Sequence, residues 1–186
     1  MTVEDEPAAD GRRARGAKRR AEIIAATLRV VQGEGAAGVT HRAVATEADI
    51  PTSLITYYFA TLDDLLVAAL SSVADTYTAR VRDIIDHHDD PLRGLAELIV
   101  ESGGSGRERA LAERELSTLA ARRPPLRPVA RHWRENVAAL ASTITDDPDA
   151  ITALVATSDG LCTAILIEGA PADVDQVHAV LRHAIG

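Results

Sequence analysis

Cysteine is almost missing from this 186-residue sequence, in which Cys162 is the single example. One thiol cannot close an internal disulfide or form a multi-cysteine metal site. The N-terminus shows no secretory leader, and no apolar run reaches the roughly 18 residues that a membrane-spanning helix needs. These absences predict a cytoplasmic protein that works in a reducing environment and does not enter a membrane.

Aromatic residues are scarce as well, since the chain has one Trp, one Phe and three Tyr. Its twelve Gly and eight Pro punctuate long stretches that are rich in helix formers such as Ala, Leu, Arg and Glu. Apolar residues make up 46% of the chain and charged residues 26%, the proportions of a soluble globular protein. We therefore expect an all-α protein of about nine helices with no strand of consequence.

Positive charge is in the minority, because the net charge is −8, but it is concentrated near the N-terminus. Residues 11–46 hold eight Lys and Arg against two acidic residues, a local net charge of +6. From Asp63 onward, twelve basic residues stand against twenty acidic ones. A basic segment on an acidic body is expected where only that segment approaches a polyanion, although a solvated basic tail would give the same pattern.

Hydrophobic spacing divides the chain into three parts. Residues 1–16 show no periodicity and are predicted to form a disordered basic arm. Residues 17–60 are expected to hold three short helices that form one small unit. Residues 61–186 are expected to form a larger helical body.

Helix-capping signals place the starts of several helices. Thr40 precedes the second short helix and is a suitable N-cap, and Pro51 suits the first turn of the third. Thr61 is the next N-cap candidate, with acidic residues in the turn that follows, where the helix dipole favours them. The long helix that starts there is expected to run to about His87.

The last two predicted helices, residues 148–168 and 172–185, carry more apolar surface than one neighbouring helix can cover. The apolar positions of the first are Ile151, Leu154, Val155, Leu161, Ile165 and Leu166. An apolar face of this size indicates contact with another subunit. We expect a homodimer that forms through these two helices.

The three short helices have the dimensions of a helix-turn-helix, in which the third helix enters the major groove of DNA. Short polar side chains suit base edges, and hydroxyl, imidazole or basic groups beside them suit phosphates. The candidates for base edges are Thr52, Ser53 and Thr56. The candidates for phosphates are Thr40, His41, Arg42, Tyr57 and Tyr58.

A resemblance to a known family rests on these same residues. The matching run, residues 20–70, reads RAEIIAATLRVVQGEGAAGVTHRAVATEADIPTSLITYYFATLDDLLVAAL. It resembles the DNA-binding domain of the TetR family of transcriptional repressors: a Gly follows the first helix, a Thr opens the second, an aromatic cluster ending in Phe closes the third, and an acidic pair precedes Leu-Leu. The resemblance implies an all-helical C-terminal domain for ligand binding and dimerisation.

The resemblance also implies a role for each matching position. Phosphate contacts would come from Thr40, Tyr57 and Tyr58, a backbone or groove contact from Arg42, base contacts from Thr52 and Ser53, and packing of the three-helix core from Phe59.

Three positions depart from the family pattern. Thr56 stands where the family usually has Tyr, Leu62 where it usually has Lys, and Asp49 where it usually has Gly, so Asp49 is expected to adopt the left-handed backbone conformation. The basic residues from Arg12 to Arg20 are expected to compensate for the missing Lys by following the minor groove or the phosphate backbone.

In proteins of this family a small-molecule effector binds the body and releases a dimer from a palindromic operator. Polar or aromatic side chains on otherwise apolar helix faces are the candidates for contacting such an effector. They are Tyr77, Trp133, Asn136, Asp159 and Cys162. Each of them has an alternative role as a satisfied core residue.

Other functions have less support in the sequence. An enzyme would need a nucleophile with its base or a cofactor loop, and the chain contains no GxGxxG, phosphate loop or GxSxG motif, so we expect no catalytic activity and no cofactor. His87-His88 followed by Asp89-Asp90 is typical of a solvated helix end rather than of a metal site. A helical interaction module without DNA binding stays the alternative, and it leaves the basic N-terminal segment unexplained.

Overall fold

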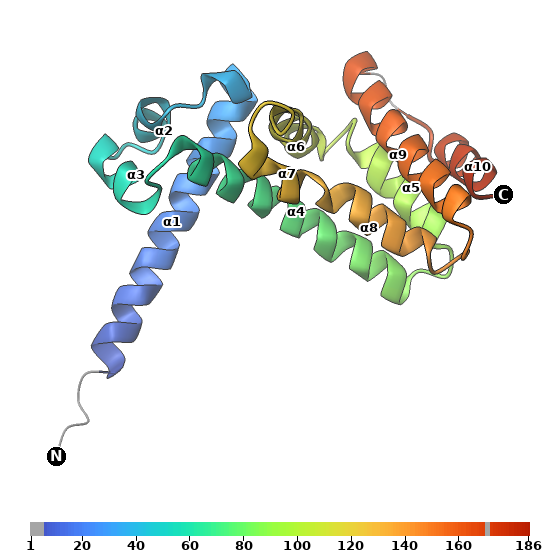
Figure 1. Ribbon diagram of the computed structural model, residues 1–186, viewed down its shortest axis with the longest axis horizontal. Helices are drawn as coiled ribbons and strands as arrows, with labels where there is room; N and C mark the ends of the chain where they lie inside the picture. The colour runs from blue at the N-terminus through green and yellow to red at the C-terminus, as the bar shows by residue number, and fades with distance from the viewer. Residues whose placement is uncertain (1–5, 170–171) are drawn as a thin grey trace. The chain divides into compact units, whose positions relative to one another are not determined.

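The computed structural model describes residues 6–169 and 172–186 (Figure 1). Side chains are described from Arg13 onward within these ranges. Within them the chain contains helices and no strand. The helices are α1 (Glu6–Glu34), α2 (His41–Glu47), α3 (Thr52–Tyr58), α4 (Leu62–His87), α5 (Pro91–Glu101), α6 (Arg107–Leu119), α7 (Arg127–Ala130), α8 (His132–Ala141), α9 (Pro148–Glu168) and α10 (Val174–Ile185), with short 3-10 turns η1 (Ala36–Gly38) and η2 (Pro124–Leu126). The prediction of an all-α fold is confirmed.

The chain divides into two compact units, residues 1–69, which we call the head, and residues 70–186, which we call the body. Helix α4 starts in the head and continues into the body. In the head, α1 packs on α2 and α2 packs on α3. Their core includes Ile23, Ile55 and Phe59, which are almost completely buried, so Phe59 has the packing role expected for it.

The helix caps and the turn of the head form as the sequence predicted. The Thr40 hydroxyl oxygen accepts from the backbone N–H of Ala43 at 3.0 Å and caps α2. At the start of α4, Thr61 and Asp64 form a reciprocal capping box: each side chain accepts from the other residue's backbone N–H, at 3.0 and 3.1 Å. Asp49, in the turn between α2 and α3, has φ 51°, the left-handed conformation expected where relatives carry Gly.

Helices α5, α8, α9 and α10 pack together in the body, and α6 packs on α7. The completely buried side chains include Leu95, Leu116, Leu140 and Leu154. Two polar contacts join α5 to α10 as well. Arg93 donates to Asp175 at 2.8 Å, and the imidazole of His178 lies 2.9 Å from Asp90, the N-cap of α5.

Two stretches differ from the sequence prediction. Helix α1 extends back to Glu6, so residues 6–16, which the sequence predicted to be disordered, continue the helix, and residues 1–5 lie outside the described residues. The helical spacing of Val129, Trp133, Val137, Leu140 and Ile144 predicts one helix over residues 126–145, but the structure has η2, α7 and α8 there. Pro124 and Pro125 lie in η2, and Pro128 lies in the first turn of α7, where a missing N–H is tolerated.

Helix α9 is long and apolar enough to cross a membrane by length and composition alone, which the sequence prediction did not expect of any segment. An 18-residue window of this 21-residue helix has a mean hydropathy of 1.8, although the window contains the charged Asp159. Only 28% of that apolar window is buried inside the structure. Helix α9 packs against α8 and α10, and Leu154, Val155, Ile165 and Leu166, which the sequence predicted to face another subunit, are buried within the body. Ile167 is the exposed large apolar residue of α9.

Candidate nucleic-acid interface and body cavity

The exposed surface of α3 presents hydroxyl groups. Thr52 and Ser53 lie in its first turn and are exposed, as is Thr56 one turn later. The Thr56 hydroxyl donates to the carbonyl oxygen of Ser53 at 3.0 Å, so its single proton is used within the helix. Thr56 therefore offers an outside group only lone pairs and a methyl group, whereas the hydroxyls of Thr52 and Ser53 can donate or accept.

The start of α2 lies beside this surface and presents one hydroxyl and one guanidinium. Thr40 is exposed, and because its oxygen accepts from Ala43, its proton stays available for an outside acceptor. Arg42 is exposed and makes no ion pair with any described side chain. His41 differs from its prediction, because it is half-buried and its Nε2 is shielded from solvent without a partner in the described part of the chain. That nitrogen is poorly placed to reach a phosphate.

The two tyrosines at the end of α3 differ in exposure. Tyr57 is 79% exposed, whereas Tyr58 is half-buried, and their rings meet edge to face with centroids 5.1 Å apart. The guanidinium of Arg20 lies 4.8 Å above the ring of the next residue, Phe59, where a cation is attracted to the aromatic face. The adjacent aromatics therefore have separate roles, Tyr57 outside and Phe59 in the core.

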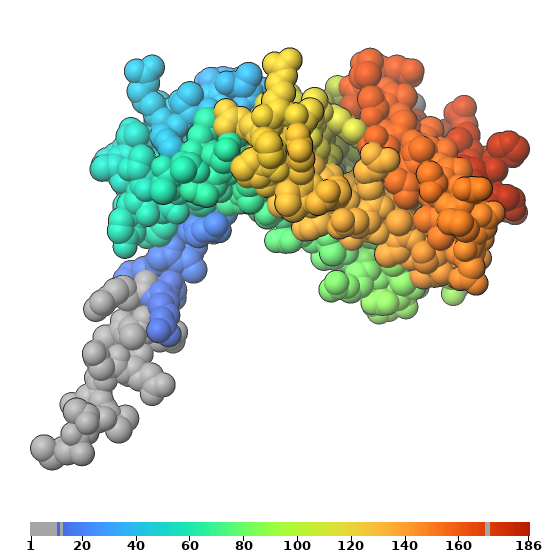
Figure 2. All heavy atoms as spheres, viewed as in Figure 1, coloured from blue at the N-terminus to red at the C-terminus, as the bar shows by residue number. Residues whose placement is uncertain are grey.

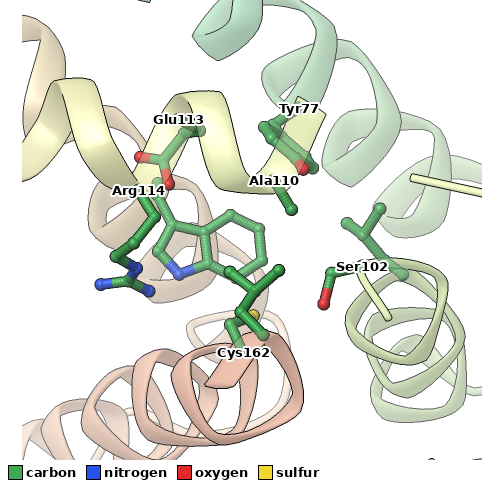
Figure 3. Close-up of a pocket in the computed structure, with 9 residues that line it drawn as sticks. Tyr77, Ser102, Ala110, Glu113, Arg114 and Cys162 are labelled. Atoms are coloured by element: carbon green, nitrogen blue, oxygen red, sulfur yellow. The ribbon is translucent and has the colours of Figure 1, made fainter. Parts of the chain in front are cut away.

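A cavity lies inside the body among α4, α5, α6, α8 and α9 (Figure 3). Its lining residues are Tyr77, Leu98, Ser102, Ala110, Glu113, Arg114, Trp133, Cys162 and Leu166. The rings of Tyr77 and Trp133 meet edge to face with centroids 5.6 Å apart. About 20 Å³ of this space is open to the centre of a water molecule, which is room for a water and not for a drug-sized ligand.

One side of the cavity carries a carboxylate in largely apolar surroundings. Glu113 accepts from the hydroxyl of Ser117 at 2.6 Å and forms no ion pair with a described residue. Its neighbour Arg114 pairs with Asp159 at 2.9 Å, and the charge of Arg114 favours the ionised form of Glu113 only partly. Burial raises the pKa of Glu113, since removal from water penalises its charged form. The same cause raises the pKa of Tyr77 and of Cys162 to about 12, so both are neutral at pH 7.

Two donors at the cavity have no partner in the described part of the chain. They are the indole N–H of Trp133 and the Nε of Arg114, both shielded from solvent. A buried donor without an acceptor is costly, so these two atoms favour a ligand that brings an acceptor. Together with Glu113 and the two aromatic rings, they can recognise an aromatic molecule that carries a positive charge, and an acceptor atom on that molecule would satisfy one of the two donors.

The structure brings together only part of the predicted effector set. Tyr77, Trp133 and Cys162 line the cavity, and Asp159 acts on it through Arg114. Asn136 does not line it, because its side-chain amide donates to the hydroxyl of Thr78 at 2.8 Å.

Sequence reasoning missed Glu113 and Arg114. The helical spacing of Leu111, Leu116 and Leu119 predicts a leucine face for α6, but its buried face runs through Ala110, Ala112 and Leu116. On α6 the positions Ala110, Glu113 and Leu116 lie three residues apart and share one face. A carboxylate between two apolar residues on that face was the sequence signal that could have identified Glu113.

Comparisons with known proteins agree with this architecture. A family model described as bacterial regulatory proteins of the tetR family matches residues 23–69, and one described as the tetracyclin repressor-like C-terminal domain matches residues 86–186. Among curated proteins, HTH-type transcriptional regulator PksA of Bacillus subtilis (strain 168) is 33% identical over 84 residues, 45% of this chain and 41% of that protein. HTH-type transcriptional regulator BetI of Burkholderia cenocepacia (strain HI2424) is 35% identical over 44% of this chain and 42% of its own length. The match thus spans less than half the length of these curated relatives.

Solved structures are similar over most of their length. The multidrug binding protein EbrR complexed with ethidium is 43% identical with a TM-score of 0.77, covering 90% of this chain and 98% of that one. EbrR complexed with malachite green is 44% identical with the same TM-score and coverage. A member of the TetR family from Streptomyces coelicolor A3 is 44% identical with a TM-score of 0.80, again over 90% and 98% of the two chains. This chain therefore belongs to the TetR family of DNA-binding transcriptional regulators.

Proposed function

We propose that this chain is a cytoplasmic repressor that binds a palindromic operator as a homodimer and is released from it by a small aromatic cation. The observation that carries the proposal is the pairing of two features in one chain. The head has an exposed, hydroxyl-bearing α3, and the body has an aromatic cavity with a carboxylate that lacks a counter-ion.

The proposed contacts on DNA follow from exposure and hydrogen-bonding capacity. Thr52 and Ser53 read base edges, because their short hydroxyls can approach the floor of the major groove. Thr40, Arg42 and Tyr57 bind phosphates on either side, which positions α3 without reading sequence. Thr56 adds a methyl contact or an acceptor, since its proton is committed to the carbonyl of Ser53.

Replacing Thr52 by Ala is expected to weaken binding to the preferred operator by about 1–3 kcal/mol and to relax the preference at one base pair per half-site. The measurement is titration of the protein against a set of operators that each carry one changed base pair. The matched control is Thr118→Ala, which removes an exposed helical threonine from α6, away from the proposed dimer helices. Equal losses on every operator of the set would contradict a base contact by Thr52.

Replacing Tyr57 by Phe is expected to weaken binding by about 1 kcal/mol, or roughly five-fold, to the same extent on every operator variant. The reason is that a phosphate contact carries no sequence information, and Tyr57 is exposed enough to lose only its hydroxyl contact. Fluorescence anisotropy over the same operator set measures this. A loss confined to one base-pair variant would assign Tyr57 to base reading instead.

The proposed effector class rests on the chemistry of the cavity. Because burial raises the pKa of Glu113, its ionised form is destabilised, and a bound cation would supply the missing counter-ion. Tyr77 and Trp133 offer aromatic faces and edges to a planar ring system. Ethidium and malachite green, the ligands in the EbrR complexes, are aromatic cations, and that likeness of 43–44% identity supports the same class here.

Entry of such a ligand requires the cavity to open, since its present volume holds no more than a water molecule or two. Tyr77, which lines the cavity, is on α4, and the first residues of α4 belong to the head. A ligand that displaces Tyr77 would therefore shift the helix that connects the two units. We infer that this shift alters the spacing of the two heads in a dimer, so that the dimer no longer fits two half-sites.

The proposed dimer forms through α9 and α10. Ile167 on α9 and Val180 on α10 are exposed large apolar side chains, 79% and 40%, and the small residues Ala156, Gly160 and Ala164 of α9 are exposed as well. An apolar face of this kind is typical of a subunit interface. A second copy of the chain would cover it symmetrically.

The experiment that tests the proposal is retention of fragments of the source genome by the purified protein at increasing salt concentration. The repressor account predicts retention of fragments that share an inverted repeat, with log affinity falling linearly with log salt. Failure to retain any fragment above a nonspecific level would favour the alternative of an interaction module without DNA binding.

A further inference from the structure

We propose that residues 13–20 of α1, which we call the α1 extension, form a second DNA-binding surface that holds the phosphate backbone outside the base pairs read by α3. The inference rests on the proposed DNA-binding function and deepens it. The partner is the DNA flanking each half-site.

The α1 extension is an addition to the matched family domain. The tetR family match begins at residue 23, whereas α1 begins at Glu6 as one continuous helix. The extension therefore lies ahead of the segment that packs the core of the head, where the first completely buried residue of α1 is Ile23. Packing of the head does not explain why the α1 extension is rich in Arg and Lys. We therefore infer that these basic side chains bind a partner outside the head.

Positive charge on the α1 extension is largely uncompensated. Arg13, Arg15 and Lys18 are exposed and form no ion pair with any side chain that the structure describes. Arg19 pairs with Glu22 at 2.8 Å, and Arg20 is placed over the ring of Phe59. Residues 12–20 contain no acidic residue at all. Three free cations within six residues are expected to attract a polyanion strongly.

The α1 extension lies next to the end of the proposed recognition helix. A Cβ atom at Gly16 would be 3.9 Å from the hydroxyl oxygen of Tyr58, and Arg20 contacts Phe59, the residue that follows α3. In Figure 2 the blue atoms of α1 continue past the cyan atoms of α2 and α3. Phosphates that contact Tyr57 at the groove edge would therefore continue along the strand towards the α1 extension.

Helical structure decides which part of DNA the α1 extension can contact. A helix with its side chains is about 10–12 Å wide, and the minor groove of B-DNA is only about 6 Å wide. A flexible arm could enter that groove, whereas this helix must lie across the phosphates. Its eight residues span about 12 Å, which matches roughly three or four phosphates along one strand.

The test compares two triple variants with equal loss of charge. The first is Arg13→Gln, Arg15→Gln, Lys18→Gln in the α1 extension, and the matched control is Arg82→Gln, Arg122→Gln, Arg134→Gln, three exposed arginines of the body. Each full-length protein is titrated against a retained genomic fragment trimmed to its inverted repeat, and against the same repeat with about ten base pairs added on each side, about one turn of duplex.

The wild type is expected to bind the flanked duplex more tightly and with a steeper salt dependence than the trimmed one. The extension variant should lose this advantage, and its slope of log affinity against log salt should fall by up to about 0.9 for each phosphate contact removed. The control variant should behave as the wild type. A further variant, Arg13→Lys with Arg15→Lys, keeps the charge and should restore the slope.

Two outcomes would overturn the inference: an extension variant that keeps the flank advantage, or equal losses in both triple variants, which would indicate a general effect of net charge. In either case the wild type still binds the trimmed repeat, so the proposed function stands. A wild type that binds neither duplex would refute the proposed function itself. Circular dichroism checks folding, and because the three side chains form no ion pairs within the described chain, helix content should not change.

Discussion

Replacing Ile167 by Asp is expected to convert the dimer to a monomer and to weaken binding to the palindromic operator by about 10²–10⁴-fold. Ile167 is 79% exposed on α9, and a charge there would be buried without a partner if α9 forms the subunit interface. The operator affinity falls because two linked heads gain an effective concentration that a single head lacks. Light scattering after size exclusion gives the mass, and titration of the operator gives the affinity.

The matched control for Ile167→Asp is Ile144→Asp. Ile144 is also a large exposed apolar residue, 43% exposed, but it follows α8 and lies outside the last two helices. This control should stay dimeric and keep its operator affinity. Binding of the Ile167→Asp variant to a single half-site should also stay intact, which shows that the head is folded. A dimer of Ile167→Asp with unchanged affinity would refute an interface through α9.

Replacing Glu113 by Gln is expected to weaken binding of an aromatic cation by about 2 kcal/mol or more, which is about 30-fold. The amide keeps the shape of the carboxylate but removes the negative charge that faces the ligand. Isothermal titration with malachite green measures the affinity. The control is Glu108→Gln, which removes an exposed carboxylate from the first turn of the same helix and should leave the affinity unchanged.

The pH dependence has a definite sign. The wild type must ionise Glu113 to pair with a cation, and burial raises the pKa of this group, so the affinity should increase as pH rises through that raised pKa. The Glu113→Gln variant should lose this increase. A wild-type affinity that is flat with pH, or a variant that keeps the increase, would exclude Glu113 as the counter-ion.

Stability should change in the opposite direction. Because the pKa of Glu113 is higher in the folded state than in the unfolded chain, its favourable contribution is fully present below the unfolded pKa and is lost as pH rises through the folded pKa. The Glu113→Gln variant should therefore match the wild type in acid and unfold at higher denaturant concentration at neutral or alkaline pH. Denaturant melts at several pH values test this.

Local signals made most of the head predictable from the sequence. The cap at Thr40, the box at Thr61 and the left-handed Asp49 each depend on residues within a few positions of one another. The exposed hydroxyls of α3 followed from the same short-range pattern. Short spacing of this kind is enough to place a helix start or a turn, and here it placed the candidate DNA surface.

The cavity in the body could be predicted only in part, because it depends on contacts between distant segments. Tertiary packing determines which face of α6 turns inward and so places Glu113 at the cavity. It also pairs Arg114 with Asp159, which is 45 residues later in the sequence. Asn136 failed as a cavity residue for the same reason, since its partner Thr78 is 58 residues away. Helix spacing alone does not determine which neighbour a polar side chain meets.

The sequence pattern also did not predict that α1 extends back to Glu6. Residues 11–20 lack the apolar periodicity that marks a packed helix, and Gly11 and Gly16 reduce helix propensity. Helix formation there extends an existing nucleus in the packed part of α1, and extension avoids the cost of starting a new helix. Sequence periodicity reports burial, so it misses a helix whose side chains face solvent.

Release of the operator by malachite green, measured on the wild type and on Glu113→Gln, tests the central claim most directly. Ethidium binds DNA itself, so malachite green is used instead, and the comparison with Glu113→Gln separates action through the protein from action on DNA. The account predicts that malachite green releases the wild type as it saturates the cavity, and that the variant needs about 30-fold more or stays bound. Release of both proteins at the same concentration, or a wild type that binds the dye without leaving the operator, would contradict it.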